Sequence, residues 1–298
     1  MKVLAGAWLT LCLLILASCG GGRSSPDPTS PLSGNWQLTL NQNYPVSQTT
    51  VPVSGFLVQS SNALSGSVQV PLIGEQSVCG GLASLTGTLS GQSVTFSLNV
   101  GGTTLSFTGT IASDNLSMSG DYQGQAGACF ARATSGTWNA FVVPPLNGKF
   151  TGTIDSTYMA ILKTGQTAPP FPVAVSGNLT QGPSAGASAT VTGTITAVGY
   201  PCFATASLSG TISGQNVYLS VFGYDGQQIG TIGSPSSSPP SPALVLSNSN
   251  GISLVANGPT NGLTLGGGNG ATAFGPCPAI LNSGISQPSD YATVSLAF

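Results

Sequence analysis

The stretch Cys79–Val100, CGGLASLTGTLSGQSVTFSLNV, decides the fold, because it recurs without a gap at Cys202–Gly223 as CFATASLSGTISGQNVYLSVFG. About half of the aligned residues are identical, and others are conservative exchanges such as Leu89 for Ile212. Each copy holds a cysteine, a predicted strand, a tight Ser-Gly-Gln turn and a second predicted strand. Self-similarity over a long period is typical of a duplicated structural unit. The sequence therefore predicts two related units in one chain.

The composition of the chain excludes several classes of protein. Charged residues make up 4% of its 298 residues, against roughly a quarter in a typical soluble domain. Hydrophobic residues make up 40% and alternate with polar ones, so the chain is not expected to be disordered. A net charge of −2 with five Lys and Arg provides no basic surface for a phosphate backbone, so we expect no nucleic-acid partner.

The N-terminus has the pattern of an export signal. Lys2 precedes an apolar run from Val3 to Leu16, which is too short for an ordinary membrane-spanning helix. The following Leu16-Ala17-Ser18-Cys19 resembles the lipobox of bacterial lipoproteins, and this resemblance covers about the first twenty residues. It implies removal of residues 1–18 and lipid attachment to Cys19. An ordinary signal peptide with a chance cysteine is the alternative.

The resemblance to lipoproteins also implies a location. Gly20 follows the cysteine, where many lipoproteins retained in the inner membrane have an aspartate. We therefore expect an exported protein, anchored by its lipid in the cell envelope at the outer membrane. Residues 19–31 are rich in Gly, Ser and Pro without apolar periodicity, which predicts a flexible tether.

Residues 32–143 have the period-two alternation of short antiparallel strands. Trp36, Leu38 and Leu40 alternate with polar residues, and turn signals recur at intervals of about 8–12 residues. This pattern predicts about eight strands in a meander, closed as a barrel or packed as a sandwich. The complete fold prediction is all-β, with two such barrels or sandwiches in tandem that derive from an internal duplication.

A Gly-x-Trp sequence begins the first predicted strand at Gly34-Asn35-Trp36 and recurs at Gly136-Thr137-Trp138. It resembles the first strand of lipocalin and avidin-like barrels, in which the tryptophan closes one end. The resemblance implies a barrel shape, but no helix follows the last strand and no biotin-binding set is present. If the barrel is hollow, the candidate ligand-lining residues are Trp36, Phe96, Phe107 and Trp138; the alternative is that the tryptophans are ordinary core residues.

Pro144-Pro145 interrupts the pattern and predicts a domain boundary, with the second repeat at residues 146–298. Leu146-Asn147-Gly148-Lys149-Phe150 matches Leu32-Ser33-Gly34-Asn35-Trp36, with phenylalanine in place of tryptophan. The second copy is longer after the shared hairpin. Its segment 233–242, GSPSSSPPSP, is predicted to be an exposed insertion.

The cysteines predict one disulfide bond in each repeat. Cys12 leaves with the signal peptide and Cys19 carries lipid, so four cysteines remain. Because the two repeats place their cysteines at matching positions, the duplication favours one of the three possible pairings. That pairing joins Cys79 to Cys129 and Cys202 to Cys277. A metal site built from the four thiolates is disfavoured, since there is no histidine and no C-x-x-C pair.

The sequence offers no catalytic constellation. Histidine is absent, which removes Ser-His triads and His ligands, and the seven acidic residues are mostly isolated near turns. Runs such as Gly266-Gly267-Gly268 lack the Lys-Ser/Thr and following helix of a phosphate-binding loop. We therefore predict no catalytic residue, no cofactor and no metal, and we predict that the protein is not an enzyme.

Three functions fit these patterns. The first is a non-catalytic envelope lipoprotein with a structural or interaction role, whose protein partner the sequence does not identify. The second is a binder of a small apolar ligand inside lipocalin-like barrels. The third is an integral outer-membrane β-barrel, prompted by the alternating Val294, Leu296 and Phe298 at the end of the sequence.

Overall fold

The computed structural model describes residues 31–44, 49–71, 80–130, 132–166, 170–232, 244–248, 263–266, 272–274 and 290–297. Strands dominate these residues, which confirms the all-β fold class predicted from the alternation. The signal peptide, Cys19, the tether up to residue 30 and the insertion at 233–242 lie outside them, as do Cys79 and Cys277.

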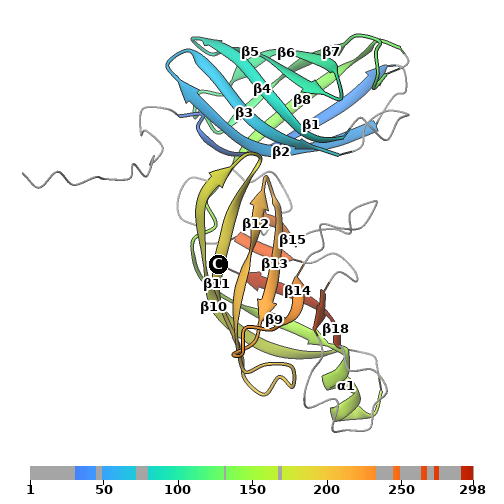
Figure 1. Ribbon diagram of the computed structural model, residues 1–298, viewed down its shortest axis with the longest axis vertical. Helices are drawn as coiled ribbons and strands as arrows, with labels where there is room; N and C mark the ends of the chain where they lie inside the picture. The colour runs from blue at the N-terminus through green and yellow to red at the C-terminus, as the bar shows by residue number, and fades with distance from the viewer. Residues whose placement is uncertain are drawn as a thin grey trace, which may run out of the picture.

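The first eight strands form a closed antiparallel barrel (Figure 1). Each strand pairs with the next one along the chain, and β8 pairs with β1 to close the ring, with Leu38 opposite Ala140 and Leu40 opposite Trp138. The first unit is therefore a meander barrel rather than a sandwich. Its strands are β1 (Gly34–Tyr44), β2 (Thr49–Ser60), β3 (Ala63–Val70), β4 (Gly81–Ser90), β5 (Ser93–Val100), β6 (Thr103–Ile111), β7 (Ser117–Gly124) and β8 (Thr134–Val143).

Alternation places the apolar residues of this barrel inside. In β5, Val94, Phe96, Leu98 and Val100 are buried, whereas Ser93, Thr95 and Asn99 are exposed. A period of two sends successive side chains to opposite faces of a strand, so one face of each strand faces the barrel interior.

The described strands of the second unit form a ten-stranded sheet in the order β12-β11-β10-β9-β18-β16-β15-β13-β14-β17. In Figure 1 it lies below the barrel, with the upper end of β12 close to β1 and β2. Its strands are β9 (Gly148–Ser156), β10 (Phe171–Ala185), β11 (Ser188–Ala197), β12 (Thr205–Ser213), β13 (Asn216–Phe222), β14 (Gln228–Ile232), β15 (Leu244–Asn248), β16 (Leu263–Gly266), β17 (Thr272–Phe274) and β18 (Asp290–Ala297).

The prediction of a second eight-stranded barrel is wrong, because this sheet branches. Along one edge, β13 pairs with β15 at Asn216 and Val217 and with β14 from Leu219 onward. Likewise, β18 pairs with both β16 and β17. The additional pairings β12–β13 and β17–β18 connect the branches. The extra length of the second copy thus supplies strands that a single closed ring does not accommodate.

A short helix, α1 (Thr157–Thr164), connects β9 to β10 and was not expected from the sequence. The Ser156 side chain accepts a hydrogen bond from the Met159 backbone N–H at 2.9 Å, which caps the first turn. Gly165 ends the helix with φ of 72°, and its N–H donates to the Ile161 carbonyl. Both ends are therefore set by local capping residues.

The two units use the same strand registers in their common part. Trp36 lies opposite Gly55 as Phe150 lies opposite Gly177. The next pairs match as well. In the first unit Leu57 lies opposite Gly66, Gly66 opposite Leu85 and Gly87 opposite Phe96. In the second unit Leu179 lies opposite Gly193, Gly193 opposite Leu208 and Gly210 opposite Leu219. The aligned sequences of the two units thus occupy equivalent places in the two sheets.

A pair of hydrogen bonds before the first strand also recurs. The Gln59 side chain accepts from the Leu32 N–H at 3.2 Å, and the Gln59 N–H donates to Ser33 Oγ at 2.9 Å. In the second unit the Gln181 side chain accepts from the Leu146 N–H at 3.0 Å, and the Gln181 N–H donates to Asn147 Oδ1 at 2.8 Å. Two equivalent glutamines, Gln59 and Gln181, therefore hold the segment before the first strand of each unit in the same way.

Candidate functional site

Three of the four candidate ligand-lining residues meet in the centre of the first barrel. Phe96 from β5 and Phe107 from β6 stack with ring centroids 4.5 Å apart and planes 7° from parallel. Trp138 from β8 lies edge-on to both rings, at 5.0 Å from Phe96 and 6.0 Å from Phe107. Such offset and edge-to-face contacts are the favoured arrangements of aromatic rings. The three side chains are at most 4% exposed, so they fill this part of the interior with one another.

Both barrel tryptophans are fully buried and have their indole N–H groups satisfied. Trp36, the fourth candidate, donates from Nε1 to the Leu32 carbonyl at 2.9 Å, and this bond holds the segment before β1 against the barrel. Trp138 donates to the Thr108 carbonyl at 3.1 Å. Each indole is thus fixed by packing and by a polar partner, as expected for core tryptophans.

Tyr122 completes the aromatic cluster, although the sequence analysis did not select it as a candidate. Its ring lies 5.6 Å from that of Phe107, and the side chain is buried. Burial raises the pKa of the Tyr122 hydroxyl above its ordinary value of 10.0, and a hydrogen bond with the Thr134 side chain opposes this change. Its alternation with exposed neighbours on β7 was the signal that could have identified it.

The contact between the two units buries polar side chains of both units. The β12–β13 turn, Ser213–Asn216, sits on the outer wall of the barrel formed by β1 and β2. The Asn35 side chain donates to the Gly214 carbonyl at 2.9 Å and accepts from the Gly214 N–H at 2.7 Å. These two bonds make a side-chain amide pair with the backbone of a turn.

Further hydrogen bonds extend the contact on both sides of this pair. The hydroxyls of Ser54 and Ser213 are 3.0 Å apart, and the Gln215 N–H donates to Gln37 Oε1 at 3.2 Å. Asn35, Gln37 and Ser54 point outward from the barrel, yet each is no more than 5% exposed. Sequence reasoning missed this site because outward polar residues on strands normally face solvent.

Apolar side chains surround the polar contact. Phe56 and Val143 of the barrel belong to the hydrophobic core of the second unit, and the partly buried Phe141 packs against the same core. The remaining buried apolar residues of the barrel form a separate core. The two units therefore pack together through a mixed polar and apolar interface.

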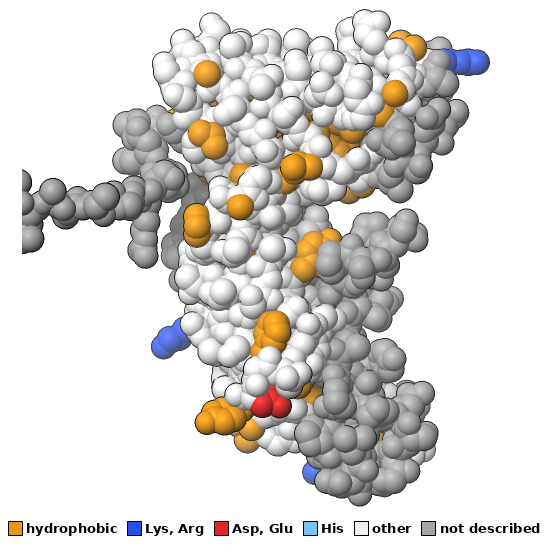
Figure 2. All heavy atoms as spheres, in the orientation of Figure 1, with side chains coloured by type: hydrophobic (Ala, Val, Ile, Leu, Met, Phe, Trp, Pro, Cys, Tyr) orange, Lys and Arg blue, Asp and Glu red, His pale blue; other side chains and the backbone are white. Residues whose placement is uncertain are grey.

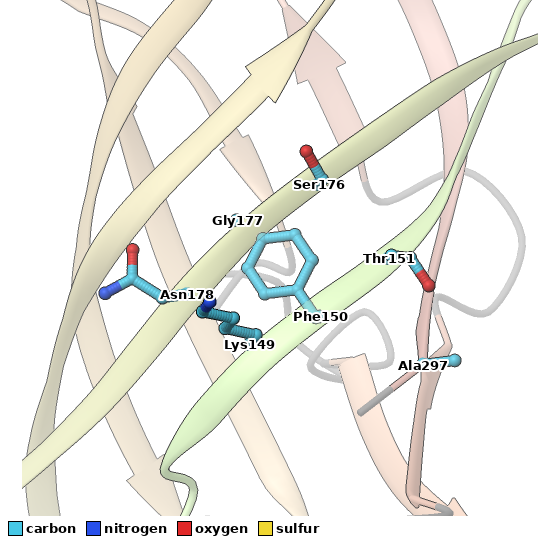
Figure 3. A pocket seen from close by; sticks show the side chains of 7 residues that line it. All are labelled: Lys149, Phe150, Thr151, Ser176, Gly177, Asn178 and Ala297. Carbon is cyan, nitrogen blue, oxygen red and sulfur yellow. The ribbon is translucent and has the colours of Figure 1, made fainter.

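A shallow hollow of about 680 Å³ opens on the second unit (Figure 3). Residues of β9, β10 and the end of β18 line it: Lys149, Phe150, Thr151, Ser176, Gly177, Asn178 and Ala297. Lys149, Thr151, Ser176 and Asn178 are exposed, whereas Phe150 is buried beneath them. The hollow thus exposes the Lys149 ammonium group, the Thr151 and Ser176 hydroxyls and the Asn178 carboxamide.

The two described cysteines are buried, and the predicted disulfide partner of each lies outside the described residues. Cys129 and Cys202 are 1% and 6% exposed. Their predicted partners, Cys79 and Cys277, are not among the residues that the structure describes. The two disulfide bonds, Cys79–Cys129 and Cys202–Cys277, therefore stay a prediction.

Within the described residues, no group of three or more His, Cys, Asp or Glu side chains could hold a metal ion. The same part of the chain contains no helix that is long and apolar enough to cross a lipid bilayer. The chain matches no protein-family model, and no curated protein or solved structure is significantly similar to it.

Proposed function

We propose that this protein is a non-catalytic, lipid-anchored lipoprotein of the cell envelope with a structural or interaction role. The proposal takes its location from Leu16-Ala17-Ser18-Cys19 and the apolar run before it. Lipid on Cys19 attaches the chain to the outer membrane, and residues 19–31 tether the folded units to that anchor.

The observation that favours this role over the binding of a small apolar ligand is the packed interior of the first barrel. A binder of a small apolar molecule needs a pocket of several hundred cubic ångströms, lined by side chains that face it. Phe96, Phe107 and Trp138 instead contact one another at ring distances of 4.5–6.0 Å. These contacts support a role for the aromatic residues in stabilising the barrel.

The outer surface supports this role over that of an integral outer-membrane barrel. A barrel that spans a membrane has apolar residues facing outward and polar residues inside. Here the apolar side chains of β4, β5 and β6 are buried except Leu82, and the other exposed ones are mainly Ser and Thr. The face in Figure 2 is accordingly dominated by uncharged polar groups and backbone, with few apolar or charged side chains.

We infer that the two units arose by tandem duplication. The shared strand registers from β1–β2 to β4–β5 and the recurring Gln59 and Gln181 bonds support this inference. On the same ground we propose one disulfide bond per repeat, Cys79–Cys129 and Cys202–Cys277. The burial of Cys129 and Cys202 supports this proposal.

Replacement of Cys19 tests the anchor. The Cys19→Ser variant cannot accept lipid, so we expect it to leave the membrane fraction after a carbonate wash, while a Ser18→Ala control stays with the membranes. A Cys19→Ser protein that still sediments with washed membranes would contradict the anchor.

Titration with an apolar fluorescent probe, such as 1-anilinonaphthalene-8-sulfonate, tests the absence of a ligand cavity. We expect no saturable one-to-one binding by the wild-type chain, because the interior is filled. A Trp138→Ala variant titrated with benzene provides the matched control, since removal of a buried indole leaves an apolar cavity that benzene can enter. Saturable binding by the wild-type chain with displacement by a fatty acid would favour the ligand-binding alternative.

A further inference from the structure

The barrel wall that receives the β12–β13 turn has a counterpart on the second unit. Trp36 and Gly55 are register partners in the barrel, and Phe150 and Gly177 are the equivalent partners in the second sheet. Outward residues adjacent to each pair are therefore equivalent too. Asn35, Gln37, Ser54 and Phe56 correspond to Lys149, Thr151, Ser176 and Asn178.

The closing strands extend this correspondence. Leu38 lies opposite Ala140 on β8, and Gly152, two residues beyond Phe150, lies opposite Leu296 on β18. The next residues, Phe141 and Ala297, are therefore equivalent as well. All five counterparts of the barrel wall line the hollow on the second unit (Figure 3). In the barrel these positions are covered by the β12–β13 turn and by the apolar core of the second unit, whereas their counterparts in the second unit are exposed.

The turn that occupies the barrel wall has its own counterpart in the first repeat. Ser213-Gly214-Gln215-Asn216 corresponds to Ser90-Gly91-Gln92-Ser93, which joins β4 to β5. The central glycines have similar positive φ angles, 53° for Gly214 and 60° for Gly91. Gly214 is buried against the barrel, while all four residues of the Ser90–Ser93 turn are exposed. The chain thus has a second turn equivalent to the docked one, at Ser90–Ser93. It also has a second strand surface equivalent to the barrel wall, which is the hollow on the second unit.

We propose that the exposed Ser90–Ser93 turn of one copy docks into the hollow at Lys149, Thr151, Ser176 and Asn178 of another copy. This inference rests on the proposed interaction role, for which it names the partner as a second copy of this chain. It does not depend on the lipid anchor.

The side chains of the hollow can replace most of the bonds seen at the barrel wall. Ser176 is positioned to meet Ser90 as Ser54 meets Ser213, whose hydroxyls are 3.0 Å apart. The Thr151 hydroxyl can accept from the Gln92 N–H, as Gln37 accepts from Gln215. Lys149 can donate to the Gly91 carbonyl but, unlike Asn35, cannot accept from the Gly91 N–H.

The differences between the two walls make the contact between copies weaker than the internal one. Asn178 and Ala297 replace Phe56 and Phe141, so the hollow lacks the apolar part of the internal interface. The turn and the hollow are different surfaces, so each copy can engage two neighbours. A contact of this heterologous kind builds open, head-to-tail chains unless a ring closes. Attachment to a membrane surface raises the local concentration and favours such weak contacts.

Cysteine cross-linking of the full chain tests the docking. Ser90 and Ser176 are exposed, so Ser90→Cys and Ser176→Cys leave the cores unchanged. We expect the double variant to form a ladder of disulfide-linked multimers under mild oxidation, and a mixture of the two single variants to form dimers. The yield should exceed by roughly tenfold that of a control pair, Ser106→Cys with Ser176→Cys, because docking raises the effective concentration of the two thiols.

The internal interface supplies a positive control, and Lys149 supplies a second test. Ser54→Cys with Ser213→Cys should cross-link within one chain, which reports that the fold and the oxidation are intact. Lys149→Ala, which removes the donor without supplying an acceptor, should lower the yield of the Ser90–Ser176 cross-link several-fold. Yields equal to the Ser106 control, or a cross-link confined to single chains, would overturn the proposal. Because membrane attachment of the Cys19→Ser variant is measured separately, failure of this cross-link does not affect the anchor.

Discussion

Alanine at the two equivalent turn glycines should have very different effects on stability. Gly91 and Gly214 both have positive φ angles, and each ends the first strand of the repeated hairpin. A Cβ on Gly91 would meet no atom within 4 Å. A Cβ on Gly214 would overlap the Gln37 Oε1 atom and lie 2.6 Å from the Ser54 Cβ. Gly91→Ala is therefore a matched control for the backbone strain of Gly214→Ala.

The expected difference follows from the contacts at the interface. Both variants place a Cβ in the left-handed region, which costs about 1–2 kcal/mol. Only Gly214→Ala also pushes the turn from the barrel wall and weakens the two Asn35 bonds and the Gln215–Gln37 bond. At about 1 kcal/mol net for each hydrogen bond, this adds roughly 2–3 kcal/mol. We expect total losses of about 1–2 kcal/mol for Gly91→Ala and about 3–5 kcal/mol for Gly214→Ala.

Urea unfolding followed by far-UV circular dichroism measures both variants under the same conditions. The wild-type and variant curves should have similar slopes, so that the midpoint shifts report the change in the free energy of unfolding. Equal losses for Gly91→Ala and Gly214→Ala would refute the reasoning, because they would mean that the docked turn contributes nothing to stability.

Three further predictions concern the cores, the hydroxyls and the cysteines. Phe107→Ala removes a ring that contacts three others, and we expect urea unfolding to show a loss of about 3–5 kcal/mol. Burial raises the pKa of the Tyr122 and Tyr218 hydroxyls, so their contribution to stability is present below about pH 10 and is lost as the pH rises further. Thermal unfolding of Tyr122→Phe should therefore show a smaller loss of stability at alkaline pH than that of wild type. Peptide mapping without reduction should find two bonds, Cys79–Cys129 and Cys202–Cys277, and a bond between repeats would contradict the pairing.

The alternation of residues was sufficient to predict the strands and their inner faces. Val94, Phe96 and Leu98 are buried as their spacing implies. Alternation did not distinguish a barrel from a sandwich, since both bury one face of each strand. It also could not predict the branched second sheet, because the choice of neighbours for β13 and β18 depends on contacts far apart in the sequence.

The interface between the units could not be predicted from the sequence, for a different reason. Asn35 and Gln37 occupy outward, polar positions, and the sequence alone gives no sign that another unit covers them. They are buried because the turn at Gly214 packs against them, and Gly214 is 179 residues from Asn35 along the chain. The duplication was the one useful indication in the sequence, since it identified the Ser-Gly-Gln turn as a repeated feature. The surface that this turn contacts could be identified only from the structure.

Mass spectrometry of the N-terminal peptide, from chain isolated with the membrane fraction, tests the proposed lipoprotein most directly. We predict that residues 1–18 are absent and that Cys19 is the first residue and carries the added mass of a lipid. A mature chain that begins at another residue, or a Cys19 without added mass, would contradict the account.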